Sequence, residues 1–308
     1  MEKFDVVTVG AVLIDQIGYT EYLPKKDEEI FMSKLTLQPG GSAANTAVAC
    51  SRLGLRVGFI GKVGYDNFGE VLIKDLKKEN VDTSQLKRTR KKPTGCCFII
   101  TDEQHKRHMY AFSGAANLLN ENDLNKKYIL SSKLVHLADL KNIKPLEIVA
   151  KIASSKAKIS LNPGGLIIGL GYKKIKKLLS LTDIYISSKS EAEALYGTRN
   201  INKLVDLLLA EGIETIALTL SSQGCLVANS NEKYKLSSYK VKVVDTTGAG
   251  DAFSAGFIYG LIKGFPLKKC GKYGNAIAAL CITTSGARFQ YSIKEVENIV
   301  SRYFSKNG

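Results

Sequence analysis

The chain has 308 residues, of which 44% are hydrophobic and 24% charged, and its 44 basic and 29 acidic residues give a formal net charge of +15. This length can bury a full core, and the composition excludes a disordered or fibrous chain. No stretch approaches the roughly 20 apolar residues that a bilayer span needs, so we expect a cytoplasmic protein with no membrane partner. The lysines are spread along the chain without interleaved aromatics, which favours anionic small molecules over nucleic acid as partners.

Short β-branched runs alternate with longer amphipathic patterns almost from end to end. The expected strands are Phe4–Val9, Val57–Ile60, Leu134–His136, Lys158–Leu161, Ile184–Ile186 and Thr215–Leu220. The expected helices are Gly69–Glu79, Leu146–Ser154, Ile201–Ala210 and Leu267–Thr284. Such alternation predicts an α/β fold, with a doubly wound, mostly parallel sheet flanked by helices.

Two segments, Gln16–Leu37 and Pro93–Ser113, interrupt this alternation because they contain strand-like runs and no helix. These runs are Ile30–Leu37, Gly95–Ile100 and His108–Phe112. Consecutive strands without a crossover helix pair antiparallel, so we expect the two segments to form a small β-sheet lid over one end of the core. No linker divides the rest of the chain, which predicts a single domain over residues 1–308 with a lid formed by residues 16–37 and 93–113.

A glycine pair opens the helical pattern in Pro39–Gly54, which reads PGGSAANTAVACSRLG. Gly40 and Gly41 have no Cβ, so the backbone can approach a ligand closely. Asn45 in the first turns offers both a donor and an acceptor to ligand hydroxyls. An ordinary capped helix is the alternative interpretation.

A second motif, Val244–Phe257, reads VDTTGAGDAFSAGF and joins an apolar strand to a helix through a glycine turn. Gly248 and Gly250 leave room for an anion, which the free N–H groups and the dipole at a helix start favour. Asp251 falls in the first helical turn, where it could accept a proton from a hydroxyl group. A helix cap is again the alternative, and neither a Walker A loop nor a dinucleotide fingerprint is present.

Together, in this order, the two motifs resemble the paired signatures of the PfkB carbohydrate kinase family, the ribokinase-like kinases. The resemblance extends over essentially the whole chain. It also includes Asp15 after the first strand, Gly61–Gly69, the strand-to-helix step Ile184–Leu195 and the strand Ile216–Gly224. It implies a ribokinase-like fold and transfer of a phosphoryl group from ATP to the hydroxymethyl group of a small sugar. A nucleoside is the alternative acceptor, and a phosphosugar is a less favoured one.

The resemblance also implies roles for individual residues. Asp251 would deprotonate the acceptor hydroxyl, and the anion hole would be formed by Gly248, Ala249 and Gly250. The positions that match the sugar site are Asp15, Gly40, Gly41 and Asn45, with a weaker match at Asp139. The positions that match the nucleotide site are Thr219, Ser221, Gly224, Asn275 and Ala279, although Asn275 and Ala279 are equally well explained as packing positions.

Metal ions are implied at two places. The magnesium-linked N-x-x-E motif of the family aligns with Ser188–Glu191, so Glu191 is kept for Mg²⁺ contact through water while Ser188 replaces the asparagine. Glu191 could instead be an ordinary first-turn helix acid. Backbone oxygens at Asp245 and Thr247 are the positions implied for a monovalent cation such as K⁺.

Two other classes of protein compete with the kinase interpretation. A ligand-binding regulator without catalysis would be expected to have lost Asp251, which is present. A nucleic-acid binder would use the net charge of +15. An exposed edge of the lid sheet could also pair with a second copy of the chain and form a homodimer.

Overall fold

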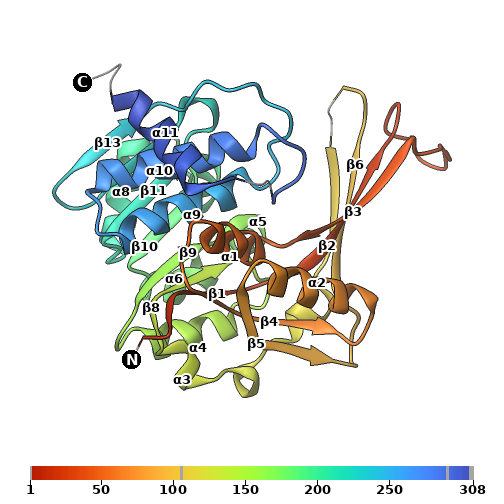
Figure 1. Ribbon diagram of the computed structural model, residues 1–308, viewed down its shortest axis with the longest axis horizontal. Helices are drawn as coiled ribbons and strands as arrows, with labels where there is room; N and C mark the ends of the chain where they lie inside the picture. Colours follow the sequence, from red (N-terminus) through yellow and green to blue (C-terminus); the bar gives the residue numbers. More distant parts are fainter. Residues whose placement is uncertain (1, 105–106, 289–290, 305–308) are drawn as a thin grey trace.

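The structure is a computed structural model that describes residues 2–104, 107–288 and 291–304. Its main sheet has nine strands in the order β13-β12-β11-β10-β9-β8-β1-β4-β5 (Figure 1). The strands are β1 (Phe4–Val9), β4 (Val57–Gly64), β5 (Val81–Thr89), β8 (Ser132–Ala138), β9 (Lys158–Asn162), β10 (Ile184–Ser188), β11 (Thr215–Thr219), β12 (Cys225–Ala228) and β13 (Lys233–Leu236). The strands from β5 to β11 pair in parallel, and β12 and β13 add antiparallel at one edge. The expected doubly wound, mostly parallel sheet is confirmed.

Helices cover both faces of this sheet. Successive strand residues such as Val6 and Val7 point to opposite faces, so each face contributes to its own hydrophobic core. The first core contains side chains of α1 (Ser42–Arg52), α2 (Asn67–Lys78), α9 (Ala249–Ile262), α10 (Leu267–Cys281) and α11 (Ile293–Phe304). The second contains side chains of α3 (Lys126–Ile129), α4 (Lys144–Ala153), α5 (Gly164–Ile168), α6 (Tyr172–Leu179), α7 (Lys189–Tyr196) and α8 (Ile201–Ala210). No helix in the described residues is long and apolar enough to cross a membrane.

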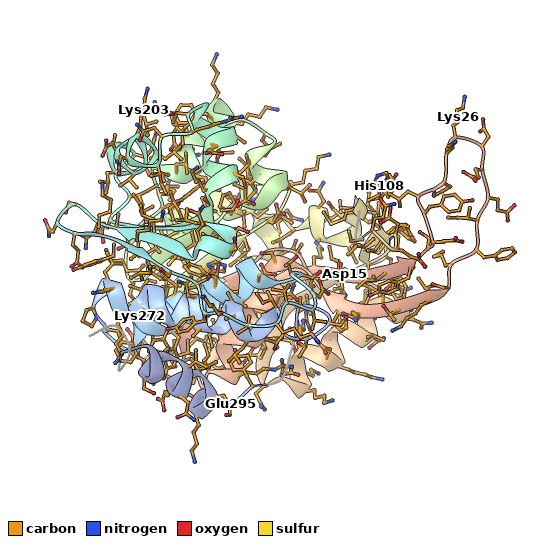
Figure 2. The ribbon with its side chains drawn as sticks, turned by 90° about the horizontal axis from the view of Figure 1, so that it is seen from above. Asp15, Lys26, His108, Lys203, Lys272 and Glu295 are labelled. Carbon is orange, nitrogen blue, oxygen red and sulfur yellow. The ribbon has the colours of Figure 1, made fainter. Side chains whose placement is uncertain are left out.

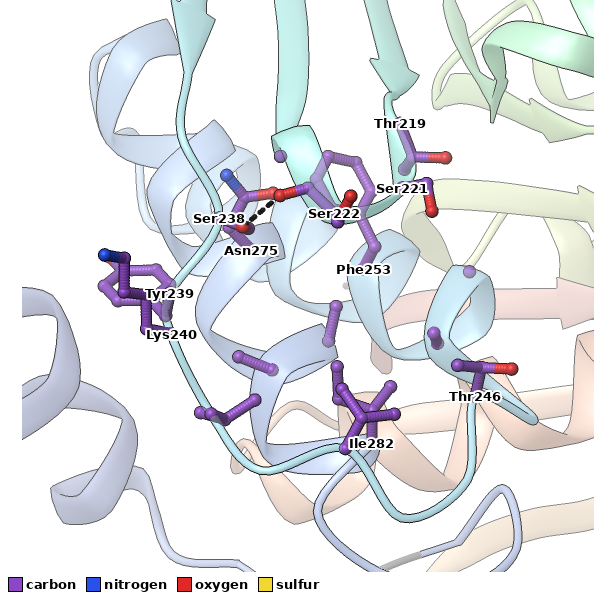
Figure 3. A pocket seen from close by; sticks show the side chains of 17 residues that line it. Thr219, Ser221, Ser222, Ser238, Tyr239, Lys240, Thr246, Phe253, Asn275 and Ile282 are labelled. Carbon is purple, nitrogen blue, oxygen red and sulfur yellow. Dashed lines mark hydrogen bonds between the residues drawn. The ribbon is translucent and has the colours of Figure 1, made fainter.

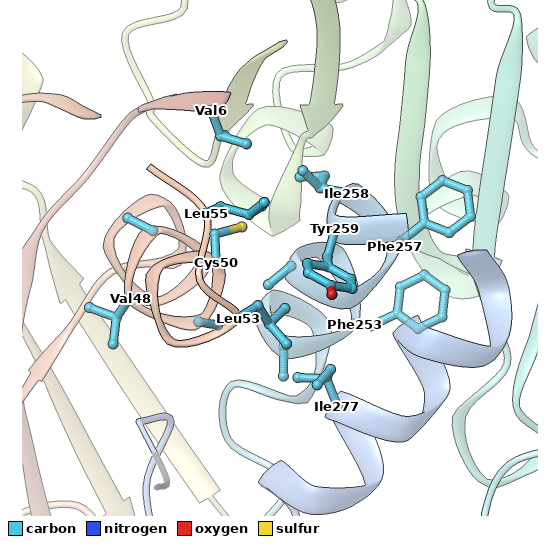
Figure 4. Close-up of a cluster of buried hydrophobic side chains, with 14 of the residues drawn as sticks. Val6, Val48, Cys50, Leu53, Leu55, Phe253, Phe257, Ile258, Tyr259 and Ile277 are labelled. Carbon is cyan, nitrogen blue, oxygen red and sulfur yellow. The ribbon is translucent and has the colours of Figure 1, made fainter. Parts of the chain in front are cut away.

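Helix α9, which carries the second glycine motif, packs closely between α1 and α10. Figure 4 shows Cys50 of α1 directed toward Ile258 and Tyr259 of α9. A Cβ atom on Gly256 would lie 2.5 Å from the carbonyl oxygen of Tyr273 in α10, so only glycine allows this approach. The expected helix Leu267–Thr284 ends earlier, at Cys281, because the next carbonyl, of Ile282, accepts the backbone N–H of Val244 at 2.7 Å.

The lid is a separate four-stranded sheet in the order β3-β2-β6-β7, and it projects from the main body (Figures 1 and 2). Its strands are β2 (Leu13–Tyr19), β3 (Lys34–Gly40), β6 (Gly95–Thr101) and β7 (Arg107–Phe112). Each consecutive pair is antiparallel as expected, whereas β2 and β6 join the two segments in parallel. The first pair of strands begins at Leu13 and ends at Gly40, beyond the expected limits of 16 and 37, because the β2–β3 ladder continues to Leu13 opposite Gly40. Residues 105 and 106 of the second segment lie outside the described residues.

The parallel strands place their carboxyl ends along one edge of the main sheet, where polar residues follow them. Asp139 follows β8, while Asn162, Ser188 and Thr219 end β9, β10 and β11. The N-terminus of α9 meets the same edge, since Asn162 Nδ2 donates to Ser254 Oγ of α9 at 3.2 Å. Ligand sites of open parallel sheets form at this edge.

Candidate active site

Two cavities meet at the carboxyl edge of the sheet. The first has a volume of about 360 Å³, and its lining includes Asp139, Glu191 and Asp251. The second has a volume of about 470 Å³ and lies between α9, α10 and the segment after β13. Thr219 and Gly250 line both cavities, so the two spaces adjoin at the start of α9.

Asp251, in the first turn of α9, lines the first cavity directly after Gly250. The helix follows Gly248, whose backbone is left-handed at φ 78° and whose absent Cβ would lie 2.5 Å from Cβ of Ala287. Ser42 Oγ donates to Asp251 Oδ1 at 2.6 Å, and Asn45 Nδ2 donates to Asp251 Oδ2 at 2.9 Å. Burial raises the pKa of the Asp251 carboxyl to about 6, while these two hydrogen bonds favour its ionised form. The fold therefore joins the two glycine motifs, 206 residues apart, through a single carboxylate.

Two further carboxylates line the first cavity. Burial, together with the nearby charges of Glu191 and Asp251, raises the pKa of Asp139 to about 7. The buried Oδ1 of Asp139 has no hydrogen-bond partner within the described part of the chain. Glu191 Oε2 accepts the backbone N–H and the hydroxyl of Ser188 at 2.8 and 2.9 Å, and Ser188 Oγ accepts from Glu191 N at 3.2 Å. Ser188 and Glu191 thus form the capping box that starts α7, and Glu191 still faces the cavity.

Asp15 and the Gly40–Gly41 pair lie together at the base of the lid. A Cβ atom on Gly40 would overlap the Asp15 carboxylate, so glycine lets this acid lie against the backbone of β3. Gly41 has φ +96°, and a Cβ atom there would lie 2.5 Å from the carbonyl oxygen of Ala11. Asp15 does not line the 360 Å³ cavity and instead sits where the lid joins the body (Figure 2).

Arg288 is a further charged side chain at this site, and no sequence motif indicated it. Its Nε donates to Asn45 Oδ1 at 3.0 Å, its guanidinium forms an ion pair with Asp75 of α2, and a second nitrogen lies 3.5 Å from the carbonyl oxygen of Gly40. The Arg288 side chain is only 9% exposed. Its position in a short Ser-Gly-Ala loop carries no periodic signal, and its partners lie more than 200 residues earlier.

All five positions that matched a nucleotide site line the 470 Å³ cavity (Figure 3): Thr219, Ser221, Gly224, Asn275 and Ala279. Much of the remaining lining is apolar and includes Val241, Val243 and Phe253. Asn275 Nδ2 donates to the carbonyl oxygen of Ser237 at 3.1 Å, which fixes the segment after β13 as one wall. Ser221 has a left-handed backbone with φ 54°, a conformation that favours glycine.

Asp245 and Thr247, the positions matched to a cation site, belong to the turn before Gly248. Asp245 Oδ1 accepts the backbone N–H and hydroxyl of Thr247 at 2.9 and 2.7 Å, and its Oδ2 accepts the backbone N–H of Gly286 at 3.0 Å. The Thr247 carbonyl accepts the thiol of Cys281 at 3.5 Å. The Asp245 side chain therefore ties the glycine turn to the loop that carries Arg288.

Comparison with known proteins agrees with the motifs. The pfkB family carbohydrate kinase profile matches residues 3–294. A ribokinase of Mus musculus is 30% identical over 306 residues, which cover 96% of this chain and 94% of that protein. The solved nucleoside kinase of Methanocaldococcus jannaschii has a TM-score of 0.86 at 27% identity, covering 98% of this chain and 100% of that chain. A ribokinase of Arabidopsis thaliana, solved with ribose and ATP, has a TM-score of 0.86 at 24% identity, covering 96% and 98%. The chain therefore belongs to the pfkB family of carbohydrate kinases and is a sugar or nucleoside kinase.

Proposed function

We propose that the protein transfers the γ-phosphoryl group of ATP to the hydroxymethyl group of a small, ribose-like sugar. The observation that carries this proposal is the position of Asp251, a carboxylate held by Ser42 and Asn45 where the two cavities adjoin. A base at this junction can reach an acceptor in one cavity and a phosphoryl group that enters from the other. The nucleotide would occupy the apolar cavity, which suits a flat base.

In the proposed reaction, Asp251 accepts the proton of the acceptor hydroxyl. The hydroxyl oxygen then forms a bond to the γ-phosphorus as the bond from that phosphorus to the β–γ bridging oxygen breaks, and ADP leaves. The backbone of Gly248, Ala249 and Gly250 opens α9, where the N–H groups of the first turn and the helix dipole would stabilise the charge on the transferred group. The chain thus supplies a base and an anion hole within one helical turn.

The acceptor would be held by side chains that recognise hydroxyl groups. We assign Asp15, at the base of the lid, to two sugar hydroxyls, with Gly40, Gly41 and Asn45 beside it. Asp139 would contact the acceptor from the 360 Å³ cavity. A nucleoside is the second candidate, supported by the structural likeness to the nucleoside kinase of M. jannaschii.

A phosphosugar is less well supported, because its second phosphate would need free basic side chains. Near the lid, Arg88 and Arg90 both stack on Tyr65, and Arg88 also pairs with Glu70 at 2.7 Å. These two arginines therefore already have partners, and we rank a phosphosugar below the other acceptors.

The residues of the first cavity fit a magnesium ion that arrives with ATP. Asp139, Glu191 and Asp251 gather like charge, and the buried, unpartnered Oδ1 of Asp139 would gain from a nearby cation. Within the described ranges, no group of three or more His, Cys, Asp or Glu side chains could hold a metal ion by itself. We assign Glu191 to water-mediated contact, and the ion would neutralise charge on the phosphates. We keep Asp245 and Thr247 as the proposed K⁺ position.

The lid is the surface through which we propose that a second copy binds. One of its faces carries the apolar side chains Leu37, Phe98 and Tyr110 in register, and these are 55%, 46% and 63% exposed. Sedimentation of wild type should give a dimer mass, and Phe98→Ser should give a monomer, whereas Val71→Ser on α2 should not change the mass. A monomeric wild type at micromolar concentration would remove this proposal.

A panel of acceptors tests the proposed function. Ribose, other pentoses, hexoses, nucleosides and phosphosugars would each be incubated with ATP and Mg²⁺, and ADP formation measured. We expect the highest kcat/KM with a non-phosphorylated ribose-like sugar, and a kcat roughly 10²- to 10⁴-fold lower with Asp251→Asn. A higher kcat/KM with a nucleoside selects the second candidate, and turnover of phosphosugars alone refutes the proposal.

A further inference from the structure

We propose that Arg288 is a positioning residue for phosphoryl transfer, which fixes the orientation of the Asn45 amide and through it the carboxylate of Asp251. This inference rests on the proposed role of Asp251 as the base. It concerns a residue that neither glycine motif contains and that lies on the loop after α10.

Arg288 joins three elements around the start of α9. Its Nε donates to Asn45 Oδ1 on α1 at 3.0 Å, and it forms an ion pair with Asp75 on α2. A further nitrogen lies 3.5 Å from the carbonyl oxygen of Gly40, the last residue of β3. The loop itself is held by the hydrogen bond from Gly286 N to Asp245 Oδ2 at 3.0 Å. The guanidinium is therefore fixed from several sides.

The direction of these hydrogen bonds decides how Asn45 is oriented. A guanidinium can only donate, so the amide oxygen of Asn45 must face Arg288. The amide nitrogen then faces Asp251 and donates to its Oδ2 at 2.9 Å. In the opposite orientation the amide oxygen would face the carboxylate, and the amide N–H groups would face the guanidinium, so both contacts would become repulsive.

Asp75 allows the guanidinium to stay charged in this setting. Burial lowers the pKa of Arg288, and the negative charge of Asp75 opposes that effect. Removing one partner of a buried pair leaves the other charge uncompensated, so a single substitution can unfold the protein. The decisive variant therefore removes both charges together.

The test uses Asp75→Leu/Arg288→Met, which replaces the pair by apolar side chains. We expect a folded protein whose kcat is roughly 10- to 100-fold lower, the size of effect expected when a base is no longer held in its reactive position. The nucleotide Kd should change less than about threefold, because Arg288 does not line the 470 Å³ cavity. The acceptor KM should change by a smaller factor than kcat, because the guanidinium acts through Asn45 on the carboxylate of Asp251.

The pH profile is a second readout that a structural role alone would not move. The acid limb of kcat/KM should shift to higher pH, because Asp251 loses a nearby positive charge and a fixed donor. The other groups that face Asp251 stay in place in the variant: Ser42 on α1, Glu191 on α7, Asp139 after β8 and Cys281 on α10.

A matched control comes from a second buried ion pair, which also involves α2. Arg52 on α1 pairs with Glu79 after α2 at 2.7 Å, with side chains 10% and 14% exposed. The variant Arg52→Met/Glu79→Leu should change thermal stability to a similar degree, with kcat and the pH profile of wild type.

An unchanged kcat and pH profile in Asp75→Leu/Arg288→Met would overturn the proposal, as would a raised acceptor KM at unchanged kcat. If the double variant does not fold, Arg288→Lys carries the same test, because lysine keeps the charge beside Asp75 but lacks the Nε–H donor to Asn45. The variant Asp251→Asn distinguishes the proposed base role of Asp251 from the proposed positioning role of Arg288. Near-normal kcat in Asp251→Asn removes the base itself, whereas a loss there with no effect at Arg288 removes only the positioning role.

Discussion

The two cavities that meet at Thr219 and Gly250 are built from different kinds of side chain. In the first cavity, which we propose as the acceptor side, the carboxylates of Asp139, Glu191 and Asp251 converge from different elements, and hydrogen bonds from α1 hold Asp251 in place. In the second cavity, which we propose as the nucleotide side, Val241, Val243 and Phe253 lie beside small residues and hydroxyl groups. The first cavity therefore presents charged groups held in fixed orientations, whereas the second presents mainly apolar surface.

This difference indicates where a substitution should matter. Proton transfer and recognition of hydroxyl groups need donors and acceptors at fixed angles, so the loss of one group changes the rate directly. Apolar contact with a flat base is spread over many atoms, each of which contributes little. We therefore expect large, specific effects on the acceptor side and small, graded effects on the nucleotide side.

The largest expected effect is at Asp251. Asp251→Asn keeps the size of the side chain but cannot accept the proton, so kcat should fall by roughly 10²- to 10⁴-fold, the usual contribution of a positioned base. Steady-state kinetics measures the loss, and thermal unfolding checks that the fold is intact. Near-normal kcat would show that the acceptor side does not depend on a fixed base.

The next effect separates binding on the two sides. Asp15→Ala removes the acid assigned to two acceptor hydroxyls, so the acceptor KM should rise by roughly 10- to 100-fold, on the order of lost charge-assisted hydrogen bonds. Nucleotide affinity, measured by calorimetry, should stay near wild type. Asp206→Ala is the matched control, since Asp206 is exposed on α8 and lines neither cavity. An equal loss of acceptor and nucleotide affinity would contradict the assignment of Asp15 to the acceptor alone.

The pH dependence tests the electrostatics of the acceptor side. Burial raises the pKa of Asp251 to about 6, so the base is protonated and inactive below that value. The value of kcat/KM should therefore fall as the pH is lowered, by about tenfold for each pH unit below about 6. A profile that stays flat down to pH 5 would contradict ionisation of Asp251 as the required state.

The smallest expected effect lies on the nucleotide side, at Ser221. Its φ of 54° is a conformation that costs an L-residue roughly 1–2 kcal/mol and costs glycine almost nothing. Ser222 is not among the residues with positive φ, so Ser222→Gly should only weaken the fold. Chemical denaturation should find Ser221→Gly more stable than Ser222→Gly by about 1 kcal/mol. The nucleotide Kd should change less than about twofold in both variants. A tenfold change would mean that nucleotide binding also depends on groups held at fixed angles.

Local sequence was sufficient for the elements whose side chains follow one period. The strand Phe4–Val9 and the helix Ile201–Ala210 occur with the expected bounds, because β-branched runs and a helical apolar stripe depend only on near neighbours. The strands β5 and β13 were not predicted, since they lie at the two edges of the main sheet and carry polar residues that mask the alternation.

The two glycine motifs were also visible in the sequence, because a tight turn into a helix requires glycine at fixed positions near the polar residue that uses it. What the sequence left open was which distant groups meet there. The contacts of Asn45 with Asp251 and with Arg288 span 206 and 243 residues, and no local pattern relates those positions. Only the packing of α1 against α9, and the return of the loop after α10 to the base of the lid, brings these side chains within hydrogen-bond distance. Periodicity and turn chemistry are properties of neighbouring residues, whereas the orientation of the Asp251 carboxylate is a property of the packed core.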